Sequence, residues 1–417
     1  MATMKPMKRN STLASSTIKN KLRVGFVVPH MFMHRDILPD VIYSPGHLSL
    51  ELCNRLQESG VEVTLYTPGP VDTSATNISS DLSLFELELS RRGEAGDSYM
   101  DLLRKHPFTF VTLARQVQSE IIARAYNDAN ESKIDIVHVY ANEEELALSF
   151  AALCRKPTVF THHDPYNFLV KYKSIFPKYR HLNWISMSHA QRLGMPDDTN
   201  WVENIYHGLP KDKFTPTKNP TGEYFAYLGR IIEPKGVHLA IRAVQKYNEE
   251  YPPSRLLIAG KHYSDHGKDA YWNKQILPML DEKNASYIGH ISDIPKKQEF
   301  LANAKALLVP SIFEEPFGMV AIEALACGTP VIALNSGALP ELIEQGTTGI
   351  IVSKTLYANG RLDEPRTIQS IADALSHIET IDRKLCRRSF EKRFDVDTMV
   401  KRHVDLYNRL VASAKKD

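Results

Sequence analysis

The sequence predicts an α/β protein made of two successive doubly wound parallel sheets that face each other across a cleft. Its 417 residues exceed what one hydrophobic core usually organises, so two domains are expected. Short apolar runs alternate with helical patterns along most of the chain, which favours parallel strands joined by helices. This alternation restarts at Tyr224, after a stretch rich in Pro, Lys and Thr.

The first half shows the pattern of a β-α-β unit that is repeated. Its first apolar run, Val24 to Val28, is suited to a strand buried on both faces, and Gly60 is placed to end the first helix. The elements expected here are strands at residues 21–29, 61–66, 134–140 and 158–161 and helices at residues 47–59 and 143–153.

The second half repeats the pattern and adds a helix between Gly318 and Gly328. The strands expected here lie at residues 224–229, 256–259, 285–288, 306–309 and 331–333, and a last helix at residues 394–411. The predicted organisation is a disordered tail (1–20), an N-terminal Rossmann-like domain (21–208), a linker (209–222), a C-terminal Rossmann-like domain (223–394) and a C-terminal helix (395–417).

The composition argues against two classes of protein, those that span a membrane and those that bind nucleic acid. A content of 43% hydrophobic and 24% charged residues is that of a globular protein, and no apolar run approaches a membrane span. The net charge of +2 gives no reason to expect a nucleic-acid partner. The four cysteines are widely spaced and predict reduced thiols in a cytoplasmic protein. Residues 1–20 lack the apolar core of a signal peptide, and organelle targeting is the alternative to a disordered tail.

The loop and helix after the strand at 306–309 carry two carboxylates, Glu315 and Glu323. Glu315 lies in the loop, and Glu323 lies about one and a half turns into the helix that Gly318 opens. Free N–H groups at a helix N-terminus suit a phosphate, and carboxylates accept hydrogen bonds from sugar and ribose hydroxyls. The combination indicates a nucleotide-sugar site; two surface glutamates are the alternative.

Two cations follow the first strand of the second half. Arg230 comes at the end of that strand, and Lys235 five residues later. If both reach one cleft they neutralise a diphosphate, which Arg can bind through two hydrogen bonds; solvated surface charges are the alternative.

The strand at 158–161 is followed directly by His162, His163 and Asp164. The spacing of these three residues disfavours a metal site. Consecutive side chains on an extended segment point to opposite sides, and no further ligand cluster is evident. Asp395 and Asp397 are better suited to capping the last helix than to binding a metal. The segment after the first strand, residues 29–34, has no Gly-x-Gly-x-x-Gly, which argues against a dinucleotide-dependent oxidoreductase.

The string from Pro310 to Ile332, together with Gly229-Arg230 and Lys235-Gly236, resembles the retaining glycosyltransferases of family four, which have the GT-B fold. The resemblance covers residues 21–411. It implies that the N-terminal domain lies on the acceptor side, that the C-terminal domain binds the donor nucleotide sugar, and that the C-terminal helix crosses back to the first domain. It implies transfer of a hexose from a UDP- or GDP-sugar with retention of configuration, without a metal ion or other cofactor. A GT-B nucleotide-sugar epimerase and a catalytically inactive nucleotide-sugar-binding protein are the alternatives.

The resemblance also implies roles for individual residues. Arg230 and Lys235 would bind the leaving diphosphate, Glu315 the sugar hydroxyls and Glu323 the ribose, while His163 would hydrogen-bond the sugar or the reacting oxyanion. The catalytic set is therefore Glu315, His163, Arg230 and Lys235. The remaining donor-binding positions are Phe317, Gly318, Met319 and Val320 at the helix N-terminus, Ile291 in the loop that meets the base, and Gly46, where related enzymes usually have adjacent glycines.

The first half, which shapes the acceptor pocket, carries weaker motifs, so the sequence does not identify the acceptor among small molecules, glycans and lipids. Residues 171–180 are basic and aromatic and are expected to form a solvated loop, with weak peripheral contact with an anionic membrane, or contact with an acidic acceptor, as the alternatives. The sequence does not indicate an oligomeric state.

Overall fold

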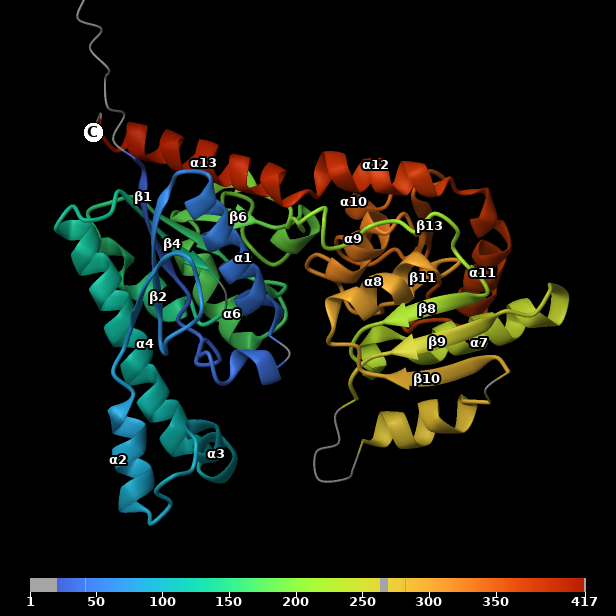
Figure 1. The fold of residues 1–417 in the computed structure, drawn as a ribbon, viewed down its shortest axis with the longest axis horizontal. Helices are drawn as coiled ribbons and strands as arrows, with labels where there is room; N and C mark the ends of the chain where they lie inside the picture. Colours follow the sequence, from blue (N-terminus) through green and yellow to red (C-terminus); the bar gives the residue numbers. More distant parts are fainter. Residues whose placement is uncertain (1–20, 42, 141, 263–268, 282, 416–417) are drawn as a thin grey trace, which may run out of the picture.

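The computed structural model describes residues 21–41, 43–140, 142–262, 269–281 and 283–415; the tail expected at residues 1–20 lies outside these ranges. The chain forms two α/β halves that lie side by side, with the last helices running along one side of both (Figure 1). In the described ranges, no helix combines the length and the apolar character needed to cross a bilayer.

Each half contains one sheet in which all strands are parallel. The first sheet has the order β3-β2-β1-β4-β5-β6-β7 and the second the order β10-β9-β8-β11-β12-β13. The strands of the first are β1 (Arg23–Val27), β2 (Glu62–Thr67), β3 (Thr76–Ser79), β4 (Ile136–Tyr140), β5 (Thr158–Thr161), β6 (Asn183–Ser186) and β7 (Trp201–Asn204). Those of the second are β8 (Tyr224–Leu228), β9 (Arg255–Ala259), β10 (Ala285–Gly289), β11 (Leu307–Val309), β12 (Val331–Leu334) and β13 (Gly349–Val352).

Helices cover both sheets. The first half contains α1 (Ser44–Glu58), α2 (Ser83–Arg91), α3 (Tyr99–Lys105), α4 (Pro107–Asn130), α5 (Glu145–Phe150) and α6 (Val170–Ile175). The second contains α7 (Val237–Glu250), α8 (Ile294–Ala302), α9 (Met319–Ala326), α10 (Leu339–Leu342), α11 (Glu364–His377) and α12 (Arg383–Arg393), and α13 (Val396–Ser413) ends the described chain. Figure 1 shows α2, α3 and the start of α4 projecting away from the first sheet.

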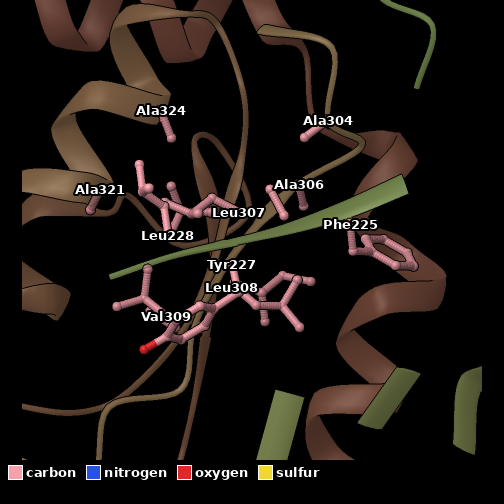
Figure 2. Packing of buried hydrophobic residues seen from close by; sticks show 14 of the residues in the cluster. Phe225, Tyr227, Leu228, Ala304, Ala306, Leu307, Leu308, Val309, Ala321 and Ala324 are labelled. Atoms are coloured by element: carbon pink, nitrogen blue, oxygen red, sulfur yellow. The ribbon is translucent and has the colours of Figure 1, made fainter. Parts of the chain in front are cut away.

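The central strands of the second sheet are buried on both faces, as the continuous apolar runs predict. Phe225 of β8 and Leu307 of β11 have no exposed surface, and Leu228 of β8 is also buried. Figure 2 shows Leu228 and Leu307 on the side of Ala321 and Ala324 of α9, with Phe225 at the other end of the cluster. Since alanine side chains are small, α9 lies close to the sheet, and its N-terminus is held at the end of β11.

Helix α13 returns to the first half. Val396, Met399 and Tyr407 are buried in the core that contains β1 and α1. The hydroxyl of Tyr407 lies 2.6 Å from Nδ1 of His138 on β4. The side chain of Asp395 accepts a hydrogen bond from the backbone N–H of Asp397, so the predicted capping role is confirmed.

Several elements differ from the sequence expectations. Helix α1 begins at Ser44, before the predicted residue 47, because Pro45 fits the first turn of a helix. The short strands β3, β6, β7 and β13 were not predicted. The loop expected at residues 171–180 was wrong: the segment contains most of α6 and a 3₁₀ turn, and its Tyr172 and Phe176 are buried beside His162.

Candidate functional site

Both sheets have a topological switch point. At such a point two strands are neighbours, and the connections that follow them run to opposite sides of the sheet. In the first sheet it lies between β1 and β4, and in the second between β8 and β11. Ligands of doubly wound sheets bind beyond the carboxyl ends of the strands at such points. In the second half, Arg230 follows β8 and the loop with Glu315 follows β11, so the sequence motifs lie at the switch point.

Lys235 and Glu315 meet there. Nζ of Lys235 lies 2.5 Å from Oε1 of Glu315 and also lies over the ring of Phe313, 5.5 Å from its centroid. Glu315 is 7% exposed. The approach depends on Gly236, which has φ +70° and where a Cβ would come within 2.0 Å of the carbonyl oxygen of Pro310. Only glycine allows these two loops to pack so closely.

Glu323 is the second buried carboxylate of the site. It is 7% exposed, and Nζ of Lys297 on α8 lies 3.2 Å from its Oε1. Burial raises the pKa of Glu323, and the nearby Lys297 opposes that effect. Its Oε2 has no hydrogen-bond partner among the described residues. The carboxylate therefore retains an oxygen that can accept a hydrogen bond from a hydroxyl.

Helix α9 begins at Met319, which lies between Glu315 and Glu323 in the sequence. Gly318 precedes it with φ +120°, a conformation that favours glycine. Phe317 is buried, while Met319 and Val320 are half-buried. Arg230 is exposed, and its carbonyl oxygen accepts a hydrogen bond from the hydroxyl of Tyr227.

His163 and His162 point into different environments, as the alternation along an extended segment predicts. His162 is surrounded by Tyr166, Tyr172 and Phe176 and contacts the buried carboxyl group of Glu144.

The ring of His163 packs against Tyr140 at 4.3 Å and lies parallel to that of His207 at 5.3 Å. Burial, with a smaller contribution from His207, lowers the pKa of His163 well below its usual value. Its two ring nitrogens have no hydrogen-bond partner in the described part of the chain.

His207 connects His163 to the second half. Its ring contacts Phe317, 4.9 Å between centroids, so the order across the boundary is His163, His207, Phe317. The sequence analysis assigned neither His207 nor Lys297 to the site, because the contacts of both residues depend on tertiary packing.

Glu341 of α10 joins the two halves next to this stack. Its carboxylate accepts hydrogen bonds from the backbone N–H groups of His189 (2.9 Å) and Ala190 (2.6 Å) and from the hydroxyl of Tyr206 (3.1 Å). The hydroxyl of Ser188 donates to the carbonyl oxygen of Pro316 at 2.7 Å. A cavity of about 540 Å³ opens between the halves at this level, and its lining includes Glu315.

Two sequence-predicted positions lie apart from the Lys235–Glu315 pair. Ile291 follows edge strand β10 and packs against the second core. Gly46 lies in the first turn of α1, where a Cβ would come within 2.6 Å of the ring of Tyr43 and 2.9 Å of Leu38. Close packing thus accounts for the glycine, and its contact with the donor stays a prediction. No three His, Cys, Asp or Glu side chains within the described ranges are grouped so that they could hold a metal ion.

Comparison with known proteins agrees with this architecture. Residues 210–388 match the family "Glycosyl transferases group 1", and residues 47–194 match "Glycosyltransferase Family 4". Among curated relatives, a glycogen synthase of Mycobacterium tuberculosis is 32% identical over 169 residues, which are 37% of this chain and 38% of that protein. A D-inositol 3-phosphate glycosyltransferase of a Mycobacterium species is 31% identical over 170 residues, 37% of this chain and 36% of that protein. The chain thus spans well under half the length of these relatives.

Solved structures show the same fold at low sequence identity. Sucrose-phosphate synthase from Thermosynechococcus elongatus aligns with a TM-score of 0.66 and 18% identity, covering 94% of this chain and all of that one. Anabaena HepE in complex with UDP and glucose aligns with a TM-score of 0.61 and 16% identity, covering 93% and 100%. The two facing parallel sheets therefore form the GT-B fold of glycosyltransferases. The chain belongs to the glycosyltransferases of group 1, family four.

Proposed function

We propose that this chain transfers a hexose from a UDP- or GDP-sugar to an acceptor hydroxyl with retention of configuration and without a metal ion. The observation that carries the proposal is the pairing of Lys235 with Glu315 at the switch point of the second sheet, directly before the N-terminus of α9. A cation, a carboxylate that can accept hydrogen bonds from hydroxyls and the start of a helix thus follow neighbouring strands of one sheet, and a nucleotide-diphosphate sugar suits this combination.

In the proposed reaction the acceptor oxygen bonds to the anomeric carbon while the bond from that carbon to the diphosphate oxygen breaks. Attack occurs on the face from which the diphosphate departs, and the acceptor proton leaves with the diphosphate. Negative charge grows on the leaving group, and Arg230, Lys235 and the α9 N-terminus stabilise it.

Other residues position the donor. Glu315 accepts hydrogen bonds from sugar hydroxyls, and Glu323 uses its free oxygen for the ribose. His163 is neutral at pH 7 because it is buried, so it offers one N–H donor and one acceptor nitrogen to the sugar. Met319 and Val320 present backbone N–H groups to the diphosphate, and Ile291 lies on the side proposed for the base.

We also propose that the protein works in the cytoplasm. Its four cysteines are all free, and Cys53, Cys327 and Cys386 are buried, which is typical of proteins from reducing compartments.

Incubation with UDP- and GDP-sugars in the absence of acceptor tests the proposed activity. A transferase should release nucleoside diphosphate slowly by hydrolysis, and Arg230→Ala should stop that release. Isomerised sugar would instead identify an epimerase. Donor binding without either product would identify an inactive binding protein and overturn the proposal.

A further inference from the structure

A cavity of about 180 Å³ lies at the switch point of the first sheet, and none of the proposed donor-binding residues lines it. Its walls come from the loop after β1, the loop after β4 and the helices α3 and α4. The lining residues are His30, Met31, Phe32, Leu103, Phe110, Val111, Ala114, Arg115, Gln118 and Glu143. The two switch points of the molecule thus provide two separate binding regions.

One wall of this cavity is apolar and continues to the surface. Met31 and Phe110 are buried within it, whereas Val111 at the mouth is 51% exposed. Phe108, one turn of α4 further out, is 89% exposed. Large apolar side chains exposed in a row beside an apolar cavity indicate a surface that contacts an apolar ligand.

Another part of the lining, which includes Arg115 and Gln118 of α4 and Glu143, is polar and close to neutral in charge. Nη1 of Arg115 lies 2.8 Å from Oε2 of Glu143 and 3.3 Å from Oε1 of Gln118. Glu143 has φ +76°, an unfavourable backbone conformation for a residue other than glycine, of the kind found at binding sites. Since Glu143 offsets the charge of Arg115, this part of the lining offers guanidinium N–H donors and carboxylate acceptors with nearly balanced charge, which matches a hydroxyl better than a phosphate.

His30 adds a further polar atom. Its Nδ1 accepts a hydrogen bond from the backbone N–H of Phe32 (3.2 Å), so the neutral ring carries its proton on Nε2 as a donor. The polar wall also lies toward the donor half: Lys171 is 4.0 Å from Glu143, and Phe168, three residues earlier, contacts Phe313 of the donor loop at 5.6 Å.

We propose that this cavity binds the apolar group of an amphiphilic acceptor, an aryl or alkyl compound whose hydroxylated head contacts Arg115 and Glu143. The assignment of the ligand as acceptor rests on the proposed transferase function. The volume exceeds the roughly 150 Å³ of a cavity that holds benzene, so one aryl ring or a short alkyl group fits. A longer chain leaves the cavity over Val111 and Phe108.

Binding of three glucosides tests the proposal without using activity. Methyl, phenyl and n-octyl β-D-glucoside share the head and differ in the apolar group; each is titrated below its micellar concentration and followed by ligand-observed NMR. We expect the phenyl and octyl compounds to bind at least about tenfold more tightly than the methyl compound, because only they bury apolar area. Equal Kd values for all three would overturn the proposal.

Variants locate the binding. Ala114→Phe fills the cavity and should remove the preference, whereas Ala114→Ser keeps the space and should retain it. Val111→Asp, at the half-exposed mouth, should weaken the preference even if Ala114→Phe does not fold. A preference that survives both Ala114→Phe and Val111→Asp would overturn the assignment.

Phe108→Ser separates the two ligand sources. If this variant binds the octyl compound more weakly than the unmodified protein does but binds the phenyl compound equally well, the natural ligand carries an alkyl chain, as in a lipid. If the variant binds both compounds as tightly as the unmodified protein does, the natural ligand carries an aryl group. Leu87→Ser, which changes an exposed residue of α2, is the matched control and should change neither. These titrations contain no donor, so the two proposals can fail separately. If the unmodified protein does not hydrolyse a donor, the transferase proposal fails and apolar binding in the cavity still stands. If the glucosides bind equally, the cavity proposal fails and the transferase proposal still stands.

Discussion

Nζ of Lys235 lies 2.5 Å from Oε1 of Glu315, although 80 residues separate them in the chain. The pair forms because β8 and β11 are neighbours whose carboxyl ends meet at one edge of the sheet, and because Gly236 allows the two following loops to touch. Each group therefore satisfies the charge of the other. In the proposed reaction Lys235 and Glu315 would bind adjacent parts of the donor, the diphosphate and the sugar.

We expect Lys235→Ala and Arg230→Ala each to lower kcat/KM for the donor by roughly 30- to 1000-fold with the fold intact, because a charge-assisted contact to the leaving group contributes about 2–4 kcal/mol. Steady-state kinetics measures the change. Lys354→Ala is the matched control, because Lys354 forms a similar pair with Glu314 at 2.5 Å and has no role in the proposed reaction. Near-normal kcat/KM in both Lys235→Ala and Arg230→Ala would refute the diphosphate assignment.

The two glutamates should differ in their kinetic effects. Glu315→Gln should chiefly lower kcat, because contacts to the reacting sugar strengthen in the transition state; Glu323→Gln should chiefly raise the donor KM, because ribose contacts are the same in both states. Lys297→Met should resemble Glu323→Gln, since it removes the partner of Glu323. A kcat defect confined to Glu323→Gln would reverse the two roles, and two silent variants would remove the site.

Turnover should persist in EDTA. Arg230, Lys235 and the N-terminus of α9 supply the positive charge that a divalent cation supplies in metal-dependent transferases. The measurement is nucleoside diphosphate release after dialysis against the chelator, with a known manganese-dependent glycosyltransferase as the control. Loss of activity that manganese or magnesium specifically restores would contradict this prediction.

The sequence was sufficient for the parts of the fold and site that depend on local pattern. Strand β5 was predicted at the residues where it occurs, and β8, β9 and β11 within one residue at each end, because buried parallel strands form continuous apolar runs. The fold was confirmed. The sequence placed Lys235 and Glu315 after two different strands of the second half, but it did not predict their direct contact.

What the sequence could not predict depends on contacts between distant elements. The amphipathic pattern of α4 did not show that its N-terminal part extends beyond the sheet and borders a cavity. Lys297 and Glu341 lie on surface helices whose partners are known only once the chain is folded. Tyr172 and Phe176 were assigned to a solvated loop because basic residues surround them in the sequence. In the structure both aromatic rings pack against His162.

Acid should destabilise the protein through its buried histidines, and His207 allows this to be measured. Burial, with a smaller effect of His403, lowers the pKa of His207 to about 3, against about 6.5 in an unfolded chain. Between these values the unfolded chain binds a proton that the folded chain does not, so the free energy of unfolding falls as the pH falls below about 6.5. At pH 5 the loss for this residue is about 2 kcal/mol.

His207→Phe keeps a ring between His163 and Phe317 and removes the titrating group, so between pH 7 and pH 5 it should lose about 2 kcal/mol less stability than the unmodified protein. Urea unfolding at the two pH values measures the difference. His181→Gln, at an exposed position, should follow the unmodified protein. If His207→Phe and the unmodified protein lose stability in parallel, His207 is not the acid-sensitive group, and the destabilisation must come from the other buried histidines, among them His163, His138 and His403.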